Sequence, residues 1–343
     1  MWRLYRLQYN RSAVGCLSFA GDFVHPCSRR YWRKIMYESV LVPLDGSPLA
    51  EQVLPFASRI SLGMGIPIHL MQVLHTVSEE LADPVHGLYR SSITAGVRDE
   101  AIDYLNSVKR RTPGAEVTCE AYEGDATAYI IEAAEKSPNS LIAMSTHGRS
   151  GVTRWLMGSV TDKVLHHTKN PMLIVRARGK GEEAGDTDLE TIIVPVDGSG
   201  LGEEVIPHVA ALASALNLKV TLLRATATAE EFGAVTGYNK VEGTAGLHFQ
   251  SFESMAKEIG NQAIDYMKGL EDKLHKQGVA SVDHRIIRGP ADEVIVDLAL
   301  ETPDNMVAMT THGRSGPARW TLGSVTDRVV RHSGDPVLVV RNG

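Results

Sequence analysis

Short apolar runs alternate with amphipathic stretches along most of this chain. Residues 39–44 form an almost unbroken apolar run that stops at Asp45-Gly46-Ser47, and residues 49–60 then place apolar side chains three and four positions apart. An apolar run closed by turn residues predicts a buried parallel strand, and the three-and-four spacing predicts a helix packed against it. Ser47 is expected to cap that helix, with Pro48 at its first position.

The same alternation runs to residue 177 and starts again at residue 191. Strands that alternate with helices in short units predict a parallel, doubly wound sheet, whose ligands bind beyond the carboxyl ends of the strands. The predicted fold is therefore α/β, with two tandem doubly wound five-stranded parallel sheets of the Rossmann-like kind. The expected strands cover residues 39–44, 68–74, 117–121, 141–145 and 171–176 in the first unit, and 191–196, 220–223, 282–287, 306–310 and 336–341 in the second.

This alternation divides the chain into a first domain over residues 36–177 and a second over residues 191–343, joined by a linker over residues 178–190. The linker is small, polar and charged, which is typical of a flexible connection. Residues 1–35 carry seven Lys or Arg residues against one acid and follow neither period. We interpret this leader as disordered, or as translated sequence upstream of the true start at Met36; a targeting segment is the alternative.

One stretch occurs in both units. Residues 144–162 and 309–327 are identical at fourteen of nineteen positions, so the chain contains a duplicated unit. Each copy is a glycine-bearing loop between an apolar strand and a helix. Loops of this kind bring backbone N–H groups close to an anion, and the helix dipole favours negative charge at that end. The pattern therefore favours phosphate binding over a plain strand-to-helix connection.

The loop resembles the ATP-binding signature of the universal stress protein family, Gly-x2-Gly-x9-Gly-Ser/Thr. The first-strand segments Val-Pro-Leu-Asp-Gly-Ser and Val-Pro-Val-Asp-Gly-Ser also resemble that family, and the likeness covers about residues 36–177 and 190–343. The nine-residue spacer is intact in both copies. The first glycine of the signature is replaced by Ser145 in one copy and by Thr310 in the other, where a side chain would crowd a ribose or form a hydrogen bond with it.

The resemblance implies one adenine-nucleotide site in each domain, built from four segments. The turn carboxylate would meet the adenine or ribose edge, the second strand would line the adenine, and the glycine after the third strand would close over the nucleotide. In the first domain these residues are Pro43 and Asp45, then Val73, then Gly124, and then Ser145, Gly148, Gly158 and Ser159 of the loop. In the second they are Pro195 and Asp197, then Ala225, then Gly289, and then Thr310, Gly313, Gly323 and Ser324.

Other polar residues of the loop allow two interpretations. Arg149 and Arg314 are candidates for phosphate contact, with a solvated loop charge as the alternative. His147 directly precedes the glycine of the loop. No other possible metal ligands occur at the spacing of a metal site, so His147 and its counterpart His312 are expected to pack the turn. Ser159 and the equivalent Ser324 are expected to begin the next helix as the first residue of a capping box.

The remaining composition narrows the class of protein. The net charge of −6 argues against nucleic acid or an anionic membrane as the main partner. No apolar run approaches the roughly 18 residues of a membrane helix. Three scattered cysteines suit neither a disulfide framework nor a zinc site, and they favour a cytoplasmic setting. No Gly-x-Ser-x-Gly elbow, Walker lysine or two-metal carboxylate cluster is present, so no dedicated catalysis is expected.

The sequence thus predicts an ATP-binding stress-response protein, with or without Mg²⁺, that acts as a nucleotide-dependent switch or interaction module. A nucleotide-free interaction module and a weak ATPase or autophosphorylating switch are the alternatives. The apolar closing strands Met172–Val175 and Val337–Val340 resemble the dimerising edge of the family. Because an exposed apolar edge must be covered, they are expected to pair within the chain as a pseudo-dimer, or between chains as a homodimer.

Overall fold

The computed structural model describes residues 36–75, 90–112, 116–146, 157–178, 188–226, 245–313 and 322–342. The predicted leader and most of the predicted linker lie outside these residues. In the first domain the elements are β1 (Ser39–Leu44), α2 (Pro48–Glu51), α3 (Leu54–Met64), β2 (Ile68–Leu74), α4 (Arg90–Arg110), β3 (Val117–Glu123), α5 (Ala126–Lys136), β4 (Ser140–Ser145), α6 (Ser159–His167) and β5 (Met172–Val175).

The second domain repeats this order. Its elements are β6 (Thr191–Pro195), η3 (Gly202–Val205), α7 (Ile206–Leu216), β7 (Lys219–Thr226), α9 (Ala245–Lys276), β8 (Val282–Arg288), α10 (Ala291–Glu301), β9 (Asn305–Thr310), α11 (Ser324–His332) and β10 (Val337–Val340). The α/β fold with two tandem Rossmann-like halves is therefore as predicted.

The two halves share one ten-stranded sheet, in the order β3-β2-β1-β4-β5-β10-β9-β6-β7-β8. Within each half the strands are parallel, and the halves meet where β10 pairs antiparallel with β5, with Leu338 opposite Leu173. The expectation of an intrachain pseudo-dimer is confirmed. This pairing covers the apolar edge that each half would otherwise expose.

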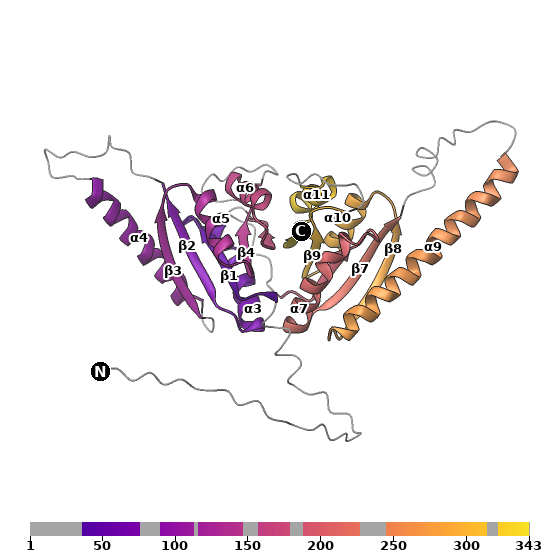
Figure 1. Cartoon of the computed structure of the whole chain (residues 1–343), viewed down its shortest axis with the longest axis horizontal. Coiled ribbons are helices and arrows are strands. Elements are labelled where there is room, and N and C mark those ends of the chain that lie inside the picture. The colour runs from indigo at the N-terminus through magenta and orange to yellow at the C-terminus, as the bar shows by residue number, and fades with distance from the viewer. Residues whose placement is uncertain are drawn as a thin grey trace, which may run out of the picture.

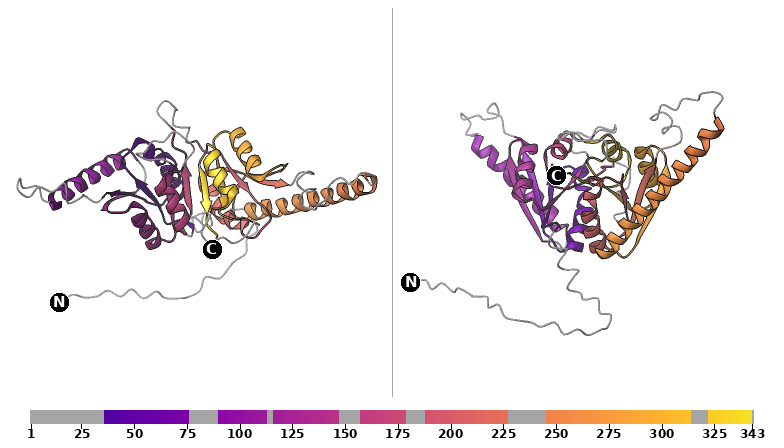
Figure 2. Two further views of the ribbon diagram at one scale, coloured as in Figure 1. Left: turned by 90° about the horizontal axis from the view of Figure 1, so that it is seen from above. Right: turned by 45° about the vertical axis from the view of Figure 1, so that its right-hand side comes forward.

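Helices cover both faces of the sheet. Helices α3, α4, α7 and α9 pack over one apolar cluster, and α5, α6, α10 and α11 pack over the other. Each cluster draws residues from both halves, so the core is continuous across the domain junction. Figure 1 and Figure 2 show the halves side by side, with α4 and α9 on the outer flanks.

The first turn forms as expected, but the helix after it does not. Ser47 Oγ accepts a hydrogen bond from Ala50 N at 3.1 Å and caps α2, with Pro48 at the first position. The apolar stripe over residues 49–60 predicted one helix, whereas the chain breaks into α2 and α3 around Gln52. Pro55 explains the break, because it lacks an N–H and its ring clashes with the carbonyl four residues earlier in a continuous helix.

Helices α3 and α7 cross closely at the domain junction. A Cβ added to Gly63 would lie 2.2 Å from Leu216 Cδ2 and 3.3 Å from the carbonyl oxygen of Ala215. The closeness of this crossing therefore depends on a residue without a side chain.

A buried polar pair also joins the two halves. The hydroxyl of Tyr37, which has no exposed surface, lies 2.8 Å from His208 Nδ1 on α7. Burial lowers the pKa of His208 to about 4. The pair connects the segment that leads into β1 with a helix of the second domain.

The substitution Gly63→Leu tests the helix crossing. We expect it to lower the free energy of unfolding in urea by about 1–3 kcal/mol, because the added side chain forces α3 and α7 apart. Gly269→Leu is the matched control: Gly269 is exposed inside α9 with no atom within 4 Å of an added Cβ. Its change should not lower the free energy of unfolding and should raise it by up to about 1 kcal/mol, because glycine is unfavourable in a helix interior. Equal effects from both substitutions would contradict the account.

The Tyr37–His208 pair predicts a pH dependence of stability. Because the folded pKa of His208 lies below the ordinary value of about 6.5, the unfolded chain binds a proton that the folded chain does not. The contribution is complete above pH 6.5 and is lost as the pH falls toward 4, by about 1–3 kcal/mol. Urea unfolding across this range should show a smaller slope in His208→Phe, and an unchanged slope would refute the assignment to His208.

Candidate functional site

A cavity of about 240 Å³ lies in the second domain, where the carboxyl ends of β6, β7 and β9 meet the start of α11. Seven residues assigned to the site from sequence line it. They are Pro195, Asp197, Ala225, Thr310, Gly313, Gly323 and Ser324. Gly289 is not among the lining residues, and Arg314 lies outside the described residues.

Asp197 lies between the first-strand turn and the glycine loop. Its Oδ1 accepts hydrogen bonds from Ser199 N at 2.9 Å and from Ser199 Oγ at 2.6 Å. An added Cβ would lie 2.2 Å from Asp197 Oδ2 at Gly313, and 2.7 Å from Asp197 Oδ1 at Gly202. The carboxylate fits against both segments because both positions are glycine.

The start of α11 is held by backbone contacts. Gly323 N donates to Thr311 O at 3.0 Å, and a Cβ at Gly323 would lie 2.7 Å from that oxygen. Thr326 Oγ1 donates to Thr310 O at 2.9 Å, which ties the first turn of the helix back to β9. Because a side chain at position 323 would clash with Thr311 O, the fold itself accounts for a glycine there without any ligand.

The predicted capping boxes are wrong. The N-cap residues are Gly158 and Gly323, and Ser159 and Ser324 are the first helical residues of α6 and α11, so neither serine side chain caps its helix. The serines are displaced by one position because the glycine carbonyls already accept the first helical hydrogen bonds, from Asp162 N in α6 and its counterpart in α11. Ser324 nevertheless lines the cavity with Val325 and Thr326.

The cavity has an apolar side and a polar side. Leu223, Ala225 and Ile295 contribute apolar surface. The first turn of α11 also lines the cavity; it has N–H groups with no partner within the helix, and the helix dipole favours an anion there. A ligand with a flat apolar end and an anionic end matches this division.

His312 contacts the turn and also lines the cavity. It was expected to pack the turn, and its Nδ1 does lie 3.2 Å from Thr311 Oγ1. It also lines the cavity, where its Nε2 is buried with no hydrogen-bond partner among the described residues. A buried polar atom without a partner is costly, which makes this nitrogen a candidate contact for a bound ligand.

The first-glycine positions are both occupied by buried side chains. Ser145 is 8% exposed and Thr310 is 7% exposed, each at the end of its strand. Thr310 Oγ1 donates to His312 O at 2.9 Å, so the loop itself uses this hydroxyl. Whether either side chain crowds a ribose stays a prediction.

In the first domain, the strand order brings the described candidates to one edge. Pro43 is the second-to-last residue of β1, and Asp45 follows that strand. Val73 is near the end of β2, Gly124 follows β3, and Ser145 ends β4; these four strands are adjacent and parallel.

The segments on either side of the first glycine loop make the same contacts as those in the second domain. Asp45 Oδ1 accepts from Ser47 N at 2.9 Å, and Thr161 Oγ1 donates to Ser145 O at 2.9 Å, as in the second domain. Gly148, Arg149 and His147 lie outside the described residues, so their roles stay predictions.

Gly124 and Gly289 have a conformational reason to be glycine. Their φ angles are +141° and +148°, which L side chains rarely adopt. A Cβ would also lie 2.9 Å from Tyr129 at Gly124 and 3.0 Å from Val294 at Gly289. These turns explain both glycines without a nucleotide, and their predicted closure over a ligand stays untested.

Asn342 bonds both the start of the glycine loop and the segment around η3, and it was not identified from the sequence. Its Oδ1 accepts from His312 N at 3.0 Å and from Thr311 Oγ1 at 3.2 Å. Its Nδ2 donates to Leu201 O at 2.9 Å and to Glu204 Oε2 at 3.0 Å. Asn342 therefore holds the glycine loop to the segment around η3.

The first domain makes the equivalent connection with different residues. Ala177 N donates to Thr146 Oγ1 at 3.2 Å, and the backbone N and O of Arg178 bond the side chain of Gln52 at 2.7 and 2.8 Å. The loop of this domain is therefore tied to the beginning of the linker.

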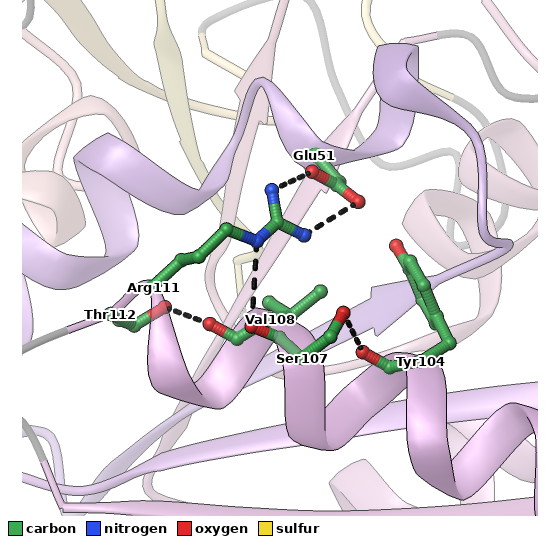
Figure 3. Close-up of polar contacts among 6 residues, drawn as sticks. All are labelled: Glu51, Tyr104, Ser107, Val108, Arg111 and Thr112. Carbon is green, nitrogen blue, oxygen red and sulfur yellow. Dashed lines mark hydrogen bonds and ion pairs between the residues drawn. The ribbon is translucent and has the colours of Figure 1, made fainter.

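In each domain a tyrosine, an acid and a cation lie together next to the turn that follows the first strand. In Figure 3, Arg111, just after α4, makes a bidentate ion pair with Glu51 at 3.0 and 3.2 Å, and the hydroxyl of Tyr104 points toward Glu51. Burial, with the charge of Glu51 adding to it, raises the pKa of Tyr104. The second domain repeats the cluster with Lys273 paired to Glu203 at 3.0 Å.

Within the described residues, no group of three or more His, Cys, Asp or Glu side chains is arranged to hold a metal ion. The described helices include none that combines the length and apolar character needed to span a bilayer. The cavity, and not a metal cluster, is therefore the basis for assigning function.

The sequence profile of the universal stress protein family matches residues 36–176 and 189–341. A universal stress protein of Mycobacterium tuberculosis is 22% identical over 312 residues, which cover 88% of this chain and 96% of that protein. A universal stress protein of Methanocaldococcus jannaschii is 29% identical over 143 residues, which cover 41% of this chain and 83% of that protein.

Solved structures share the whole architecture. The crystal structure of a universal stress protein from Archaeoglobus fulgidus is 20% identical, with a TM-score of 0.60, and the match covers 90% of this chain and 100% of that one. The family match and the full-length relative indicate no specific enzymatic activity. The chain belongs to the universal stress protein family, as a member with two such domains in tandem.

Proposed function

We propose that each domain binds an adenine nucleotide, ATP, at the carboxyl edge of its half of the sheet, and that the chain acts as a nucleotide-dependent switch without dedicated catalysis. The observation that carries the proposal is the second-domain cavity, where the turn carboxylate of Asp197, the glycine loop at Gly313 and the start of α11 come together. The last two belong to the ATP-binding signature of the family, and the turn at Asp197 belongs to the first-strand segment that also resembles that family.

The chemistry of the walls suits the parts of the ligand. The base would lie on the apolar side formed by Leu223, Ala225 and Ile295, with the ribose near Asp197. The phosphates would extend toward Gly313 and the first turn of α11, where free N–H groups and the helix dipole favour an anion. Mg²⁺, if required, would be held mainly by the phosphates and water.

The size of the cavity is consistent with part of this ligand. About 240 Å³ is just under the roughly 300–1,000 Å³ of pockets that enclose drug-sized molecules. It suits a base and ribose, with the phosphates outside it along the loop.

A nucleotide-free interaction module is the second candidate. It is favoured by the contacts that the loop already makes within the chain: Asp197 lies against Gly313, and Asn342 accepts the His312 N–H. In this account the loop is a closed structural turn.

Calorimetry with ATP tests the proposal at each site. We expect binding to the native chain, and at least a tenfold loss at the second site in Gly313→Ala, because the added Cβ displaces the Asp197 carboxylate. Gly148→Val should weaken the first site. Gly260→Ala, on α9 with no atom within 4 Å of an added Cβ, is the control. Unaltered affinity in both loop variants would show that the loops do not hold the nucleotide.

Asn342→Ala tests whether Asn342 positions the second loop. Loss of the acceptor should speed hydrogen exchange of the His312 amide at least tenfold and weaken ATP binding at that site about fivefold. Asn342→Asp keeps an acceptor oxygen and should retain most of the protection. The Gly323 amide, which donates to Thr311 O, should exchange at the native rate in both variants. Fast His312 exchange in the native chain would refute the role of Asn342.

A further inference from the structure

A second cavity, of about 290 Å³, lies at the junction of the two domains and shares no lining residue with the first. The first domain contributes Phe56 and Arg178, and the second contributes Asp304 and Asp335. Leu189, at the end of the linker, completes the apolar part of the wall.

One wall is made of hydrogen-bond acceptors. Asn305 is 1% exposed, and its Nδ2 donates to Asp335 Oδ2 at 3.0 Å and to Ala299 O at 2.8 Å. Its Oδ1 is buried with no partner among the described residues. Burial raises the pKa of Asp335, against the hydrogen bond from Asn305 and the charge of Arg178. The carboxylates of Asp335 and Asp304, together with Asn305 Oδ1, call for a cationic donor.

The cavity also carries donors. Arg176 and Arg178 both line the cavity, and their positive charges act on the carboxyl of Asp335. Gln52 fixes the backbone of Arg178 through two hydrogen bonds, at 2.7 and 2.8 Å. A guanidinium is always charged and matches a carboxylate geometrically.

The internal duplication provides a matched comparison for the acids. The position of Asp335 is occupied by Asn170 in the other half, and that of Asp304 by Asn139, each 165 residues earlier. Asn170 Nδ2 donates to Ser140 O at 3.1 Å and to Ser137 O at 2.9 Å. The equivalent place in the other half therefore carries amides where this cavity has two carboxylates.

The apolar part of the wall also departs from the duplication. Phe56 and Leu189 correspond to His208 and Tyr37, which bond each other at 2.8 Å. A polar pair that satisfies itself is thus replaced by two apolar side chains at this cavity. The cavity combines opposite charges with an apolar surface, and the equivalent place in the other half lacks the two acids and the two apolar side chains.

From these contacts we infer that the junction cavity binds a small zwitterion of the α-amino acid class with an apolar side chain. The ammonium group binds Asp335, Asp304 and Asn305 Oδ1, the carboxylate binds Arg178, and the side chain packs on Phe56 and Leu189. A volume of about 290 Å³ sets the size of such a ligand. The inference does not depend on nucleotide binding, because the two cavities share no residue.

Calorimetry on the full chain with L-leucine is the direct test. We expect saturable binding with a Kd of about 1 mM or tighter. 3-Methylbutylamine lacks the carboxylate and 4-methylpentanoate lacks the ammonium, so each should bind at least tenfold more weakly. Absence of saturable binding of L-leucine up to about 10 mM overturns the inference, as does equal binding of either one-charge analogue.

Variants assign the binding to this cavity. Asp335→Asn and Asp304→Asn introduce the residue that the other half carries, and Arg178→Gln removes the guanidinium; each should weaken L-leucine at least tenfold. Asn139→Asp, at the exposed equivalent of Asp304, is the control and should leave the affinity unchanged. Thermal unfolding without ligand verifies that each variant is folded. Native affinity in folded Asp335→Asn and Arg178→Gln would place the binding elsewhere and refute the site.

Discussion

The antiparallel pairing of β5 with β10 is the contact on which the rest of the structure depends. It places Leu173 opposite Leu338 and turns two five-stranded halves into one sheet. Because the paired strands are buried on both faces, each apolar cluster continues through the junction. The same pairing brings helices α3 and α7 into contact and creates the junction cavity, so neither of these features belongs to a single domain.

The duplication preserves the framework of the candidate sites and changes what surrounds them. Both turns place a carboxylate after the first strand. After both loops, a Thr hydroxyl in the first turn of the helix donates to the carbonyl of the last strand residue, 16 positions earlier. The anchors differ, because Asn342 holds the second loop to η3 whereas Gln52 holds the first domain to the linker. Nucleotide binding at the two sites would therefore act on different parts of the chain.

Local patterns predicted the strands, most helices, the Ser47 cap and the tandem order. These features depend on the spacing of apolar residues and on the residue types at turns, which can be read within a few residues of sequence. They placed Asp197, Ala225 and Gly313 at one edge because the carboxyl ends of parallel strands meet there. They could not predict Asn342 or the Tyr37–His208 pair, which join residues over a hundred positions apart. The serine caps failed because a glycine one residue earlier takes that position.

The central claim is that this protein holds an adenine nucleotide at the strand edges. Its most direct test is mass spectrometry of the small molecules released when freshly purified full-length protein is denatured, with nucleotide counted per chain. The account predicts ATP or another adenine nucleotide, at up to two molecules per chain. No released nucleotide, together with no heat of binding at millimolar ATP, would contradict it and favour the nucleotide-free interaction module.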